Sequence, residues 1–159
     1  EVRVAVSAER WAQGGHHPNW WPDGQHVLMN LNTQGDGLRF ARLALDGSTC
    51  ETLVPGIRGS GHPTVHPDGR HLLTDAYVDE PLAFGDGTAP IRLIDLRSGI
   101  ETQLVRIGIQ PLAELSTGAL RVDPHPAWDR SHTRIAFNAC PDGKRRVYVA
   151  DLANLLRQP

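Results

Sequence analysis

Residues 17–24 read HPNWWPDG, and this phrase decides the fold because it returns twice along the chain. The second copy, HPTVHPDG, occupies residues 62–69, and a degraded third copy, HPAWDRSH, occupies residues 125–132. Each copy opens with His-Pro, and the first two end in Pro-Asp-Gly, which is a strong turn signal. Self-similarity of this kind is the signature of a repeat architecture, in which each copy marks one structural unit.

Length and composition bound the class of protein. A chain of 159 residues, 40% hydrophobic and 21% charged, suits a single globular unit. The net charge of −2 argues against general nucleic-acid binding, which needs a basic surface to neutralise phosphates. No apolar run approaches the ~20 residues of a membrane span. We therefore expect neither nucleic acid nor membrane as a partner, two free thiols at Cys50 and Cys140, and a cytoplasmic location by default.

Short strand-like segments follow each copy of the phrase in the same order. The expected strands are residues 26–31, 38–45 and 50–54 after the first copy, 72–76, 91–96 and 101–105 after the second, and 134–138 and 146–150 after the third. Residues 1–6 alternate valine with other residues, which predicts the last strand of a preceding unit. Residues 151–157 predict either a short helix or the start of a further strand.

Four short strands per unit, joined by tight turns, are typical of a β-propeller blade. The first two phrases begin 45 residues apart and the next two 63 apart, against ~40–45 for a typical blade. We place the surplus in residues 78–88 and 108–119. The sequence thus predicts an all-β propeller segment over residues 1–159, with units at about 16–56, 61–106 and 124–159 after a tail at 1–15. A small β-sandwich or barrel is the alternative.

About three four-stranded blades are visible, whereas propellers close with about four to eight. An open arc would leave unpaired strand edges, which proteins usually avoid. The chain also lacks an initiator Met and an apolar leader. We therefore expect a fragment or a processed product, whose ring is completed by upstream blades or by another chain.

The phrase, followed by a strand and a later Ile-Asp-Leu at residues 94–96, resembles the repeats of TolB-like propellers. More specifically, His17, His62 and the segment DPHPAW at residues 123–128 resemble the C-terminal blades of oligogalacturonate lyase-type proteins. This resemblance covers nearly the whole chain but only the later blades of such a protein. It implies a seven-bladed propeller that cleaves short pectin fragments by β-elimination with a bound manganese ion.

The resemblance also implies roles for particular residues. His17 matches the histidine that acts as the catalytic base, and His62 matches a metal ligand. The family's last ligand segment is Gln-x-x-His-Pro-His-Pro. In this sequence Leu120 replaces the Gln, Asp123 replaces the first His, and His125 keeps the second. An Asp oxygen suits Mn²⁺, whereas Leu120 cannot bind a metal.

The residue types suit this chemistry. Elimination from a uronic acid removes a proton next to a carboxylate, which a metal can assist and a neutral histidine can accept. His62, Asp123 and His125 would form an open three-ligand site if the first strand of every blade faced a central channel. The architectural alternative is that each His-Pro hydrogen-bonds a neighbouring blade. At the level of the whole chain, the alternative is a non-catalytic module that binds protein or carbohydrate through its inserted loops.

The remaining histidines receive no catalytic role from the sequence, apart from His16, which is an alternative base beside His17. His66 replaces Trp21 within the phrase and is expected to be a surface or packing residue. Three others fall at strand starts or turns: His26, His71 and His132.

Overall fold

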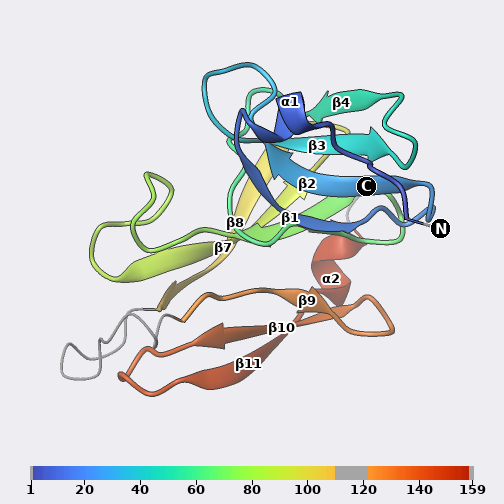
Figure 1. The fold of residues 1–159 in the computed structure, drawn as a ribbon. Helices are drawn as coiled ribbons and strands as arrows, with labels where there is room; N and C mark the ends of the chain where they lie inside the picture. The colour runs from blue at the N-terminus through green and yellow to red at the C-terminus, as the bar shows by residue number, and fades with distance from the viewer. Residues whose placement is uncertain (1, 110–121, 158–159) are drawn as a thin grey trace.

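The structure is a computed structural model, and it describes residues 2–109 and 122–157. These residues form three antiparallel sheets and two four-residue helices (Figure 1). Within each sheet, consecutive strands pair in chain order, beginning with the strand that contains a copy of the phrase. This arrangement confirms the prediction of an all-β, propeller-type fold.

The elements have the following bounds. The first sheet contains β1 (Gly15–Trp20), β2 (His26–Leu31), β3 (Arg39–Ala44) and β4 (Cys50–Leu53). The second contains β5 (Thr64–Val65), β6 (His71–Asp75), β7 (Thr88–Asp95) and β8 (Ile100–Gly108). The third contains β9 (Ala127–Trp128), β10 (Arg134–Ala139) and β11 (Arg146–Asp151). The helices are α1 (Ala8–Trp11) and α2 (Ala153–Leu156).

Two expectations differ from the structure. Residues 2–6 form no strand, because none of the described strands pairs with them. Instead Val6 packs on a cluster in the first sheet, and Ser7 caps the start of α1 through its hydroxyl. The third sheet has three strands among the described residues, and the segment after β11 forms α2, one of the two predicted outcomes.

The second and third phrases are farther apart in the sequence than the first and second, partly because the strands between them are longer. β7 and β8 contain eight and nine residues, against six and four in β3 and β4. The loop between β6 and β7 covers most of the predicted segment 78–88, whereas most of the segment 108–119 lies outside the described residues. Both cysteines are free thiols. Neither described helix has the length and apolar character that a membrane span requires.

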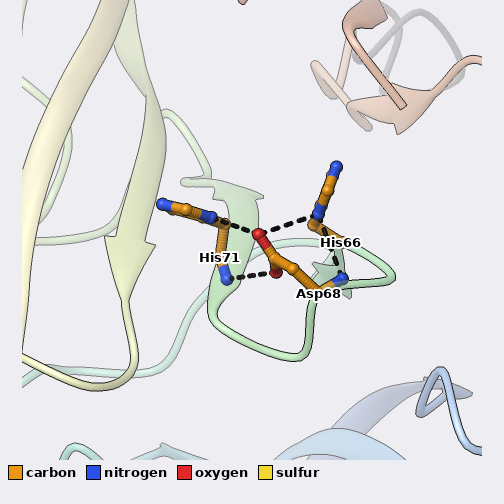
Figure 2. Close-up of side chains that lie close together, drawn as sticks. All are labelled: His66, Asp68 and His71. Atoms are coloured by element: carbon orange, nitrogen blue, oxygen red, sulfur yellow. Dashed lines mark hydrogen bonds and ion pairs between the residues drawn. The ribbon is translucent and has the colours of Figure 1, made fainter. Parts of the chain in front are cut away.

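The Pro-Asp-Gly sequences of the first two phrases, residues 22–24 and 67–69, form the turns between the first two strands of their units, and Figure 2 shows the second of them. Gly24 and Gly69 have φ values of 65° and 68°, in the left-handed region that glycine adopts without strain. The Asp68 carboxylate accepts hydrogen bonds from the next backbone N–H groups, and Asp23 does the same in the first copy. In the third copy, His132 stands at the glycine position with φ 55°. The degraded copy therefore keeps the turn.

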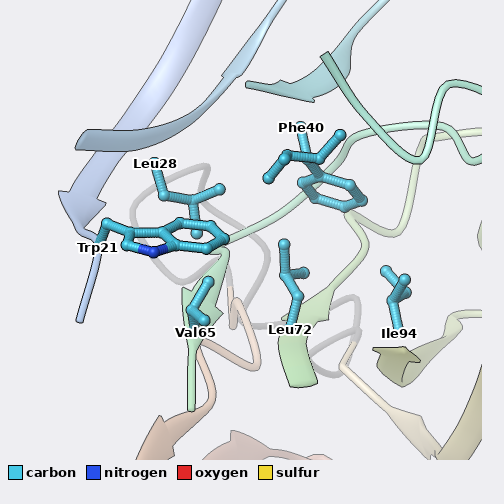
Figure 3. Close-up of a cluster of buried hydrophobic side chains, with 7 residues drawn as sticks. Trp21, Leu28, Phe40, Val65, Leu72 and Ile94 are labelled. Carbon is cyan, nitrogen blue, oxygen red and sulfur yellow. The ribbon is translucent and has the colours of Figure 1, made fainter. Parts of the chain in front are cut away.

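Two hydrophobic clusters join the three sheets face to face. One lies between the first and second sheets (Figure 3) and contains Trp21, Leu28, Phe40, Leu53, Val65, Leu72 and Ile94. The other lies between the second and third sheets and contains Leu73, Ile91, Leu93, Ile135, Phe137 and Leu152. Successive side chains of a strand point to opposite faces. Leu72 and Leu73 of β6 accordingly belong to different clusters, and all of β6 is buried.

Candidate functional site: a central histidine cluster

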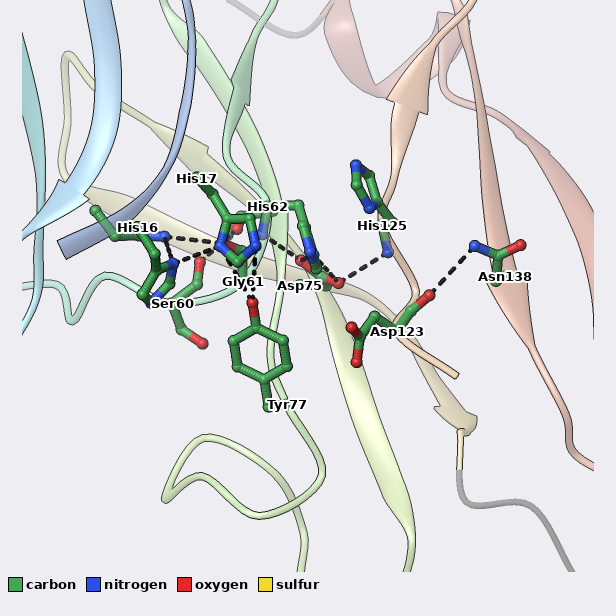
Figure 4. Close-up of polar contacts among 12 residues, drawn as sticks. His16, His17, Ser60, Gly61, His62, Asp75, Tyr77, Asp123, His125 and Asn138 are labelled. Carbon is green, nitrogen blue, oxygen red and sulfur yellow. Dashed lines mark hydrogen bonds and ion pairs between the residues drawn. The ribbon is translucent and has the colours of Figure 1, made fainter. Parts of the chain in front are cut away.

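The histidines that open the three copies of the phrase converge on one place (Figure 4). The ring centroids of His17 and His62 are 4.1 Å apart, and those of His62 and His125 are 3.9 Å apart. The rings of His62 and His125 are nearly parallel, with an interplanar angle of 17°. All three line a groove of about 520 Å³, together with Trp128 and His132. Three units of the repeat therefore contribute one histidine each to a single surface.

The backbone at these histidines is unusual. His17 and His125 have φ values of 54° and 46°, in the left-handed region that costs a non-glycine residue of order 1–3 kcal/mol. In the second copy, the positive φ falls on Gly61, immediately before His62. A side chain on Gly61 would also collide with the carboxylate and the backbone of Asp75. Each unit thus bends its chain sharply where it presents its histidine to the groove.

Asp75, at the end of β6, was not anticipated from the sequence. It is fully buried, and its carboxylate accepts the backbone N–H groups of His62 at 2.6 Å and His125 at 2.8 Å. The same carboxylate lies 3.0 Å from His62 Nδ1. Because a carboxylate only accepts hydrogen bonds, Nδ1 of His62 carries a hydrogen, which in a neutral imidazole leaves the lone pair on Nε2. Asp75 therefore ties the second unit to the third and fixes the tautomer of His62.

The register of the repeat explains the place of Asp75. Asn30 and Asn138 occupy the equivalent position in β2 and β10, offset by the same 45 and 63 residues as the phrases. The Asn30 amide donates to the carbonyl of Gly61 at 2.8 Å, and the Asn138 amide donates to the carbonyl of Asp123 at 3.3 Å. Each unit thus has a polar residue at this position, and its side chain hydrogen-bonds the backbone just before the first strand of a unit. Of the three units, only the second has a carboxylate at this position.

The environment favours the neutral form of three of the clustered histidines, His16, His17 and His125. Burial, helped by the neighbouring His62 and His16, lowers the pKa of His17 from 6.5 to about 4. Burial is also the largest cause that lowers the pKa of His16 and of His125. The hydroxyl of Tyr77 lies 3.1 Å from His17 Nδ1 and 3.3 Å from its Nε2. Neutral imidazoles are the form that can bind a metal ion or accept a proton.

No protein-family model and no curated protein sequence matches the chain. Solved structures do match. TolB from Acinetobacter baumannii aligns with 88% of this chain and 30% of its own, at 18% identity and a TM-score of 0.62. An oligogalacturonate lyase in complex with manganese aligns with 91% of this chain and 36% of its own, at 17% identity and a TM-score of 0.67. This chain has the fold of the TolB and oligogalacturonate lyase propellers.

A second oligogalacturonate lyase, from Vibrio parahaemolyticus, aligns with 86% of this chain and 35% of its own, at 17% identity and a TM-score of 0.65. The chain therefore spans about a third of each of these propeller structures. The resemblance inferred from the repeated phrase is confirmed at the level of the fold. At sequence identities of 17–18%, a shared fold does not establish a shared function. The function must therefore be inferred from the residues of this chain.

The proposed metal ligands are placed unequally in this propeller segment. His62 and His125 are stacked on one another, whereas the carboxylate of Asp123 is drawn below the ring of His125 (Figure 4). Leu120 lies outside the described residues. Within residues 2–109 and 122–157, one group of three ligand-type side chains has all its ligand atoms within 4.8 Å of one another. That group consists of His66, Asp68 and His71, which are not the residues of the central cluster. The central cluster thus gathers imidazoles from three units without closing them around one point.

The lowered pKa of His17 predicts a pH effect on the stability of the metal-free protein. The unfolded chain binds a proton at His17 below about pH 6.5, whereas the folded chain binds it only near pH 4. The free energy of unfolding should therefore fall as the pH is lowered from 6.5 to 4. Asn tolerates the left-handed backbone, so His17→Asn should show a shallower decline in urea titrations with chelator present. His26→Asn, at a half-buried histidine outside the central cluster, serves as the control. Equal slopes for wild type and His17→Asn would contradict the assignment.

Proposed function

We propose that the central histidine cluster is a metal-dependent lyase centre that cleaves acidic, uronate-containing oligosaccharides by β-elimination. The observation that carries this proposal is the convergence of His17, His62 and His125, from three separate units, on one groove. The buried Asp75 behind them supports it, because structural turns alone need no carboxylate there. The fold shared with an oligogalacturonate lyase in complex with manganese gives it a precedent.

The residues present fit a divalent cation. His62 is held by Asp75 with the lone pair of Nε2 available, and such carboxylate–histidine pairs commonly orient metal ligands. His125 has a lowered pKa and so remains neutral at neutral pH. These two imidazoles would hold the ion. Asp123, two residues before His125 in the sequence, would be an additional oxygen donor. A bound divalent cation would stabilise the negative charge that develops on the substrate carboxylate.

His17 is the residue suited to accept the proton. It is neutral at neutral pH, it lies in the groove, and its ring is adjacent to that of His62. In the elimination, His17 takes the proton from the carbon next to the carboxylate. The electron pair of that C–H bond forms the new double bond, while the C–O bond to the leaving sugar breaks, and the leaving oxygen keeps the bond's electron pair and takes up a proton from water. General-base assistance of this kind typically contributes ~10²–10⁴-fold to the rate.

The Tyr77 hydroxyl lies within hydrogen-bonding distance of both ring nitrogens of His17. A phenol can donate or accept a hydrogen bond. We assign it the role of orienting the His17 ring, and after proton transfer it can accept a hydrogen bond from the imidazolium. His16 packs edge-on against His17.

Incubation with short oligogalacturonides and Mn²⁺ tests the proposal. The new double bond is conjugated with the carboxylate and absorbs in the ultraviolet, so the absorbance should rise with time, and an excess of chelator should abolish the rise. The same oligomers are titrated calorimetrically into the chain. Binding without any rise in absorbance would favour a non-catalytic carbohydrate-binding module. The absence of both signals at saturating Mn²⁺ would refute the proposal.

A further inference from the structure

The turn between β5 and β6 brings together three ligand-type side chains that take no part in the central cluster (Figure 2). The ligand atoms of His66, Asp68 and His71 all lie within 4.8 Å of one another. Asp68 Oδ2 is 2.9 Å from His66 Nδ1 and 2.6 Å from His71 Nδ1. Since the Pro67-Asp68-Gly69 turn positions all three, the arrangement forms locally when the hairpin forms.

The hydrogen bonds of His66 indicate where its proton lies. Nε2 of His66 is 3.0 Å from the carbonyl oxygen of His132, which can only accept, so Nε2 carries the hydrogen. Nδ1 accepts the backbone N–H of Asp68 at 3.2 Å. In a neutral imidazole, Nδ1 then has a lone pair and no hydrogen. Nδ1 of His66 also lies 2.9 Å from Asp68 Oδ2, so a cation bound by these two atoms would replace the backbone N–H of Asp68 as the partner of the Nδ1 lone pair.

The carboxylate of Asp68 is fixed and ionised. Its Oδ1 accepts the backbone N–H groups of Arg70 at 2.8 Å and His71 at 3.1 Å, which leaves Oδ2 directed at the two imidazoles. Burial alone would raise the pKa of Asp68, but these hydrogen bonds and the neighbouring His71 lower it to about 2. The side chains of His71 and His66 are 9% and 18% exposed. The cluster is therefore sheltered yet open to an ion from solution.

We propose that His66, Asp68 and His71 form a second metal site, for a divalent transition ion of the Zn²⁺ class. Two imidazole nitrogens and one carboxylate oxygen form a donor set typical of zinc sites that keep a fourth position open. In the metal-free turn His71 Nδ1 donates its hydrogen to Asp68 Oδ2, so His71 would bind the ion as the tautomer that carries its hydrogen on Nε2. Ligand atoms about 2.0–2.1 Å from a tetrahedral ion are about 3.3 Å apart, a few tenths of an ångström beyond the contacts of Asp68 Oδ2. The carbonyl of His132 holds the outer nitrogen of His66, as partners of metal-binding histidines usually do.

The other copies of the phrase provide an internal comparison. The first turn has the equivalent Asp23–His26 pair, with His26 Nδ1 2.8 Å from Asp23 Oδ2, but Trp21 stands in place of His66. Trp21 is buried in the hydrophobic cluster between the first two sheets. The third copy has Ser131 in place of Asp68. All three donors thus meet in the second turn alone, beside the third unit, and a bound ion there would stabilise the junction between these units.

Titration of the whole chain with Zn²⁺ alone, followed by calorimetry and by NMR of the histidine rings, tests this site. The signals of His66 and His71 should shift on saturation, and His66→Gln should weaken Zn²⁺ binding at least tenfold. The matched variant His26→Gln alters the pair that lacks a third donor and should leave the affinity unchanged. A thermal melt of His66→Gln in the absence of zinc verifies that the variant is folded.

Three results would overturn the inference. The first is an unchanged Zn²⁺ affinity in His66→Gln. The second is a Zn²⁺-dependent shift confined to His62 and His125, which would support the central site while refuting this one. The third is a His66 signal that moves with pH and stays insensitive to Zn²⁺, which would show that a proton holds the cluster instead of a metal. The inference is independent of the proposed lyase activity, since a folded chain without turnover can still bind zinc at this turn.

Discussion

Replacement of Asp75 by alanine is expected to lower the free energy of unfolding by about 3 kcal/mol or more. The buried carboxylate accepts two backbone N–H groups and the Nδ1–H of His62, and alanine would leave all three donors without it. Each hydrogen bond to a charged group contributes about 1.5–3 kcal/mol, and an unsatisfied buried donor costs a similar amount. Urea denaturation with linear extrapolation measures the difference.

Two matched variants separate the role of Asp75 from a general effect of lost charge. Asp75→Asn copies the residue found at the equivalent position in the first and third units, and it retains one acceptor oxygen. Its loss should be smaller than that of alanine. Glu51→Gln neutralises one partner of the exposed Arg42–Glu51 pair and should change stability by less than about 0.5 kcal/mol. A loss for Asp75→Ala as small as that of Glu51→Gln would show that Asp75 does not hold the units together.

Local sequence signals were sufficient to predict the architecture. Turn chemistry and alternating apolar residues act over a few positions, so the Pro-Asp-Gly turns and the strands that follow them could be assigned directly. The shared register of the phrases also indicated that His17, His62 and His125 would face one channel, and the structure places them in one groove. Repetition made this possible, because three similar units can be superposed before any coordinates exist.

Features that depend on partners distant in the sequence could not be predicted in this way. Residues 2–6 have the alternation of a strand, but a strand also requires a neighbour, and none of the described strands provides one. Asp75 is the last residue of the buried strand β6, and its role is recognisable only when β2, β6 and β10 are aligned. The cluster at His66 and His71 was overlooked because each histidine, taken alone, is an ordinary turn residue.

The central histidines are proposed to form one metal site. His62 is its key residue, because Asp75 orients it and both His17 and His125 lie against its ring. Removal of its imidazole should lower the affinity for Mn²⁺ at least tenfold, the loss expected even for residues that only support a ligand. His125→Ala should have a comparable effect, whereas His26→Ala, at a histidine that does not line the groove, should have none.

The most direct measurement is a titration of the chain with Mn²⁺, in which electron paramagnetic resonance quantifies the free ion. The experiment is performed in a His66→Gln background, so that the turn cluster does not contribute, and circular dichroism verifies that each variant is folded. We predict that the parent binds Mn²⁺ and that His62→Ala and His125→Ala each bind it at least tenfold more weakly. Equal affinity in the parent and in both variants would contradict a metal site at the centre of this propeller segment.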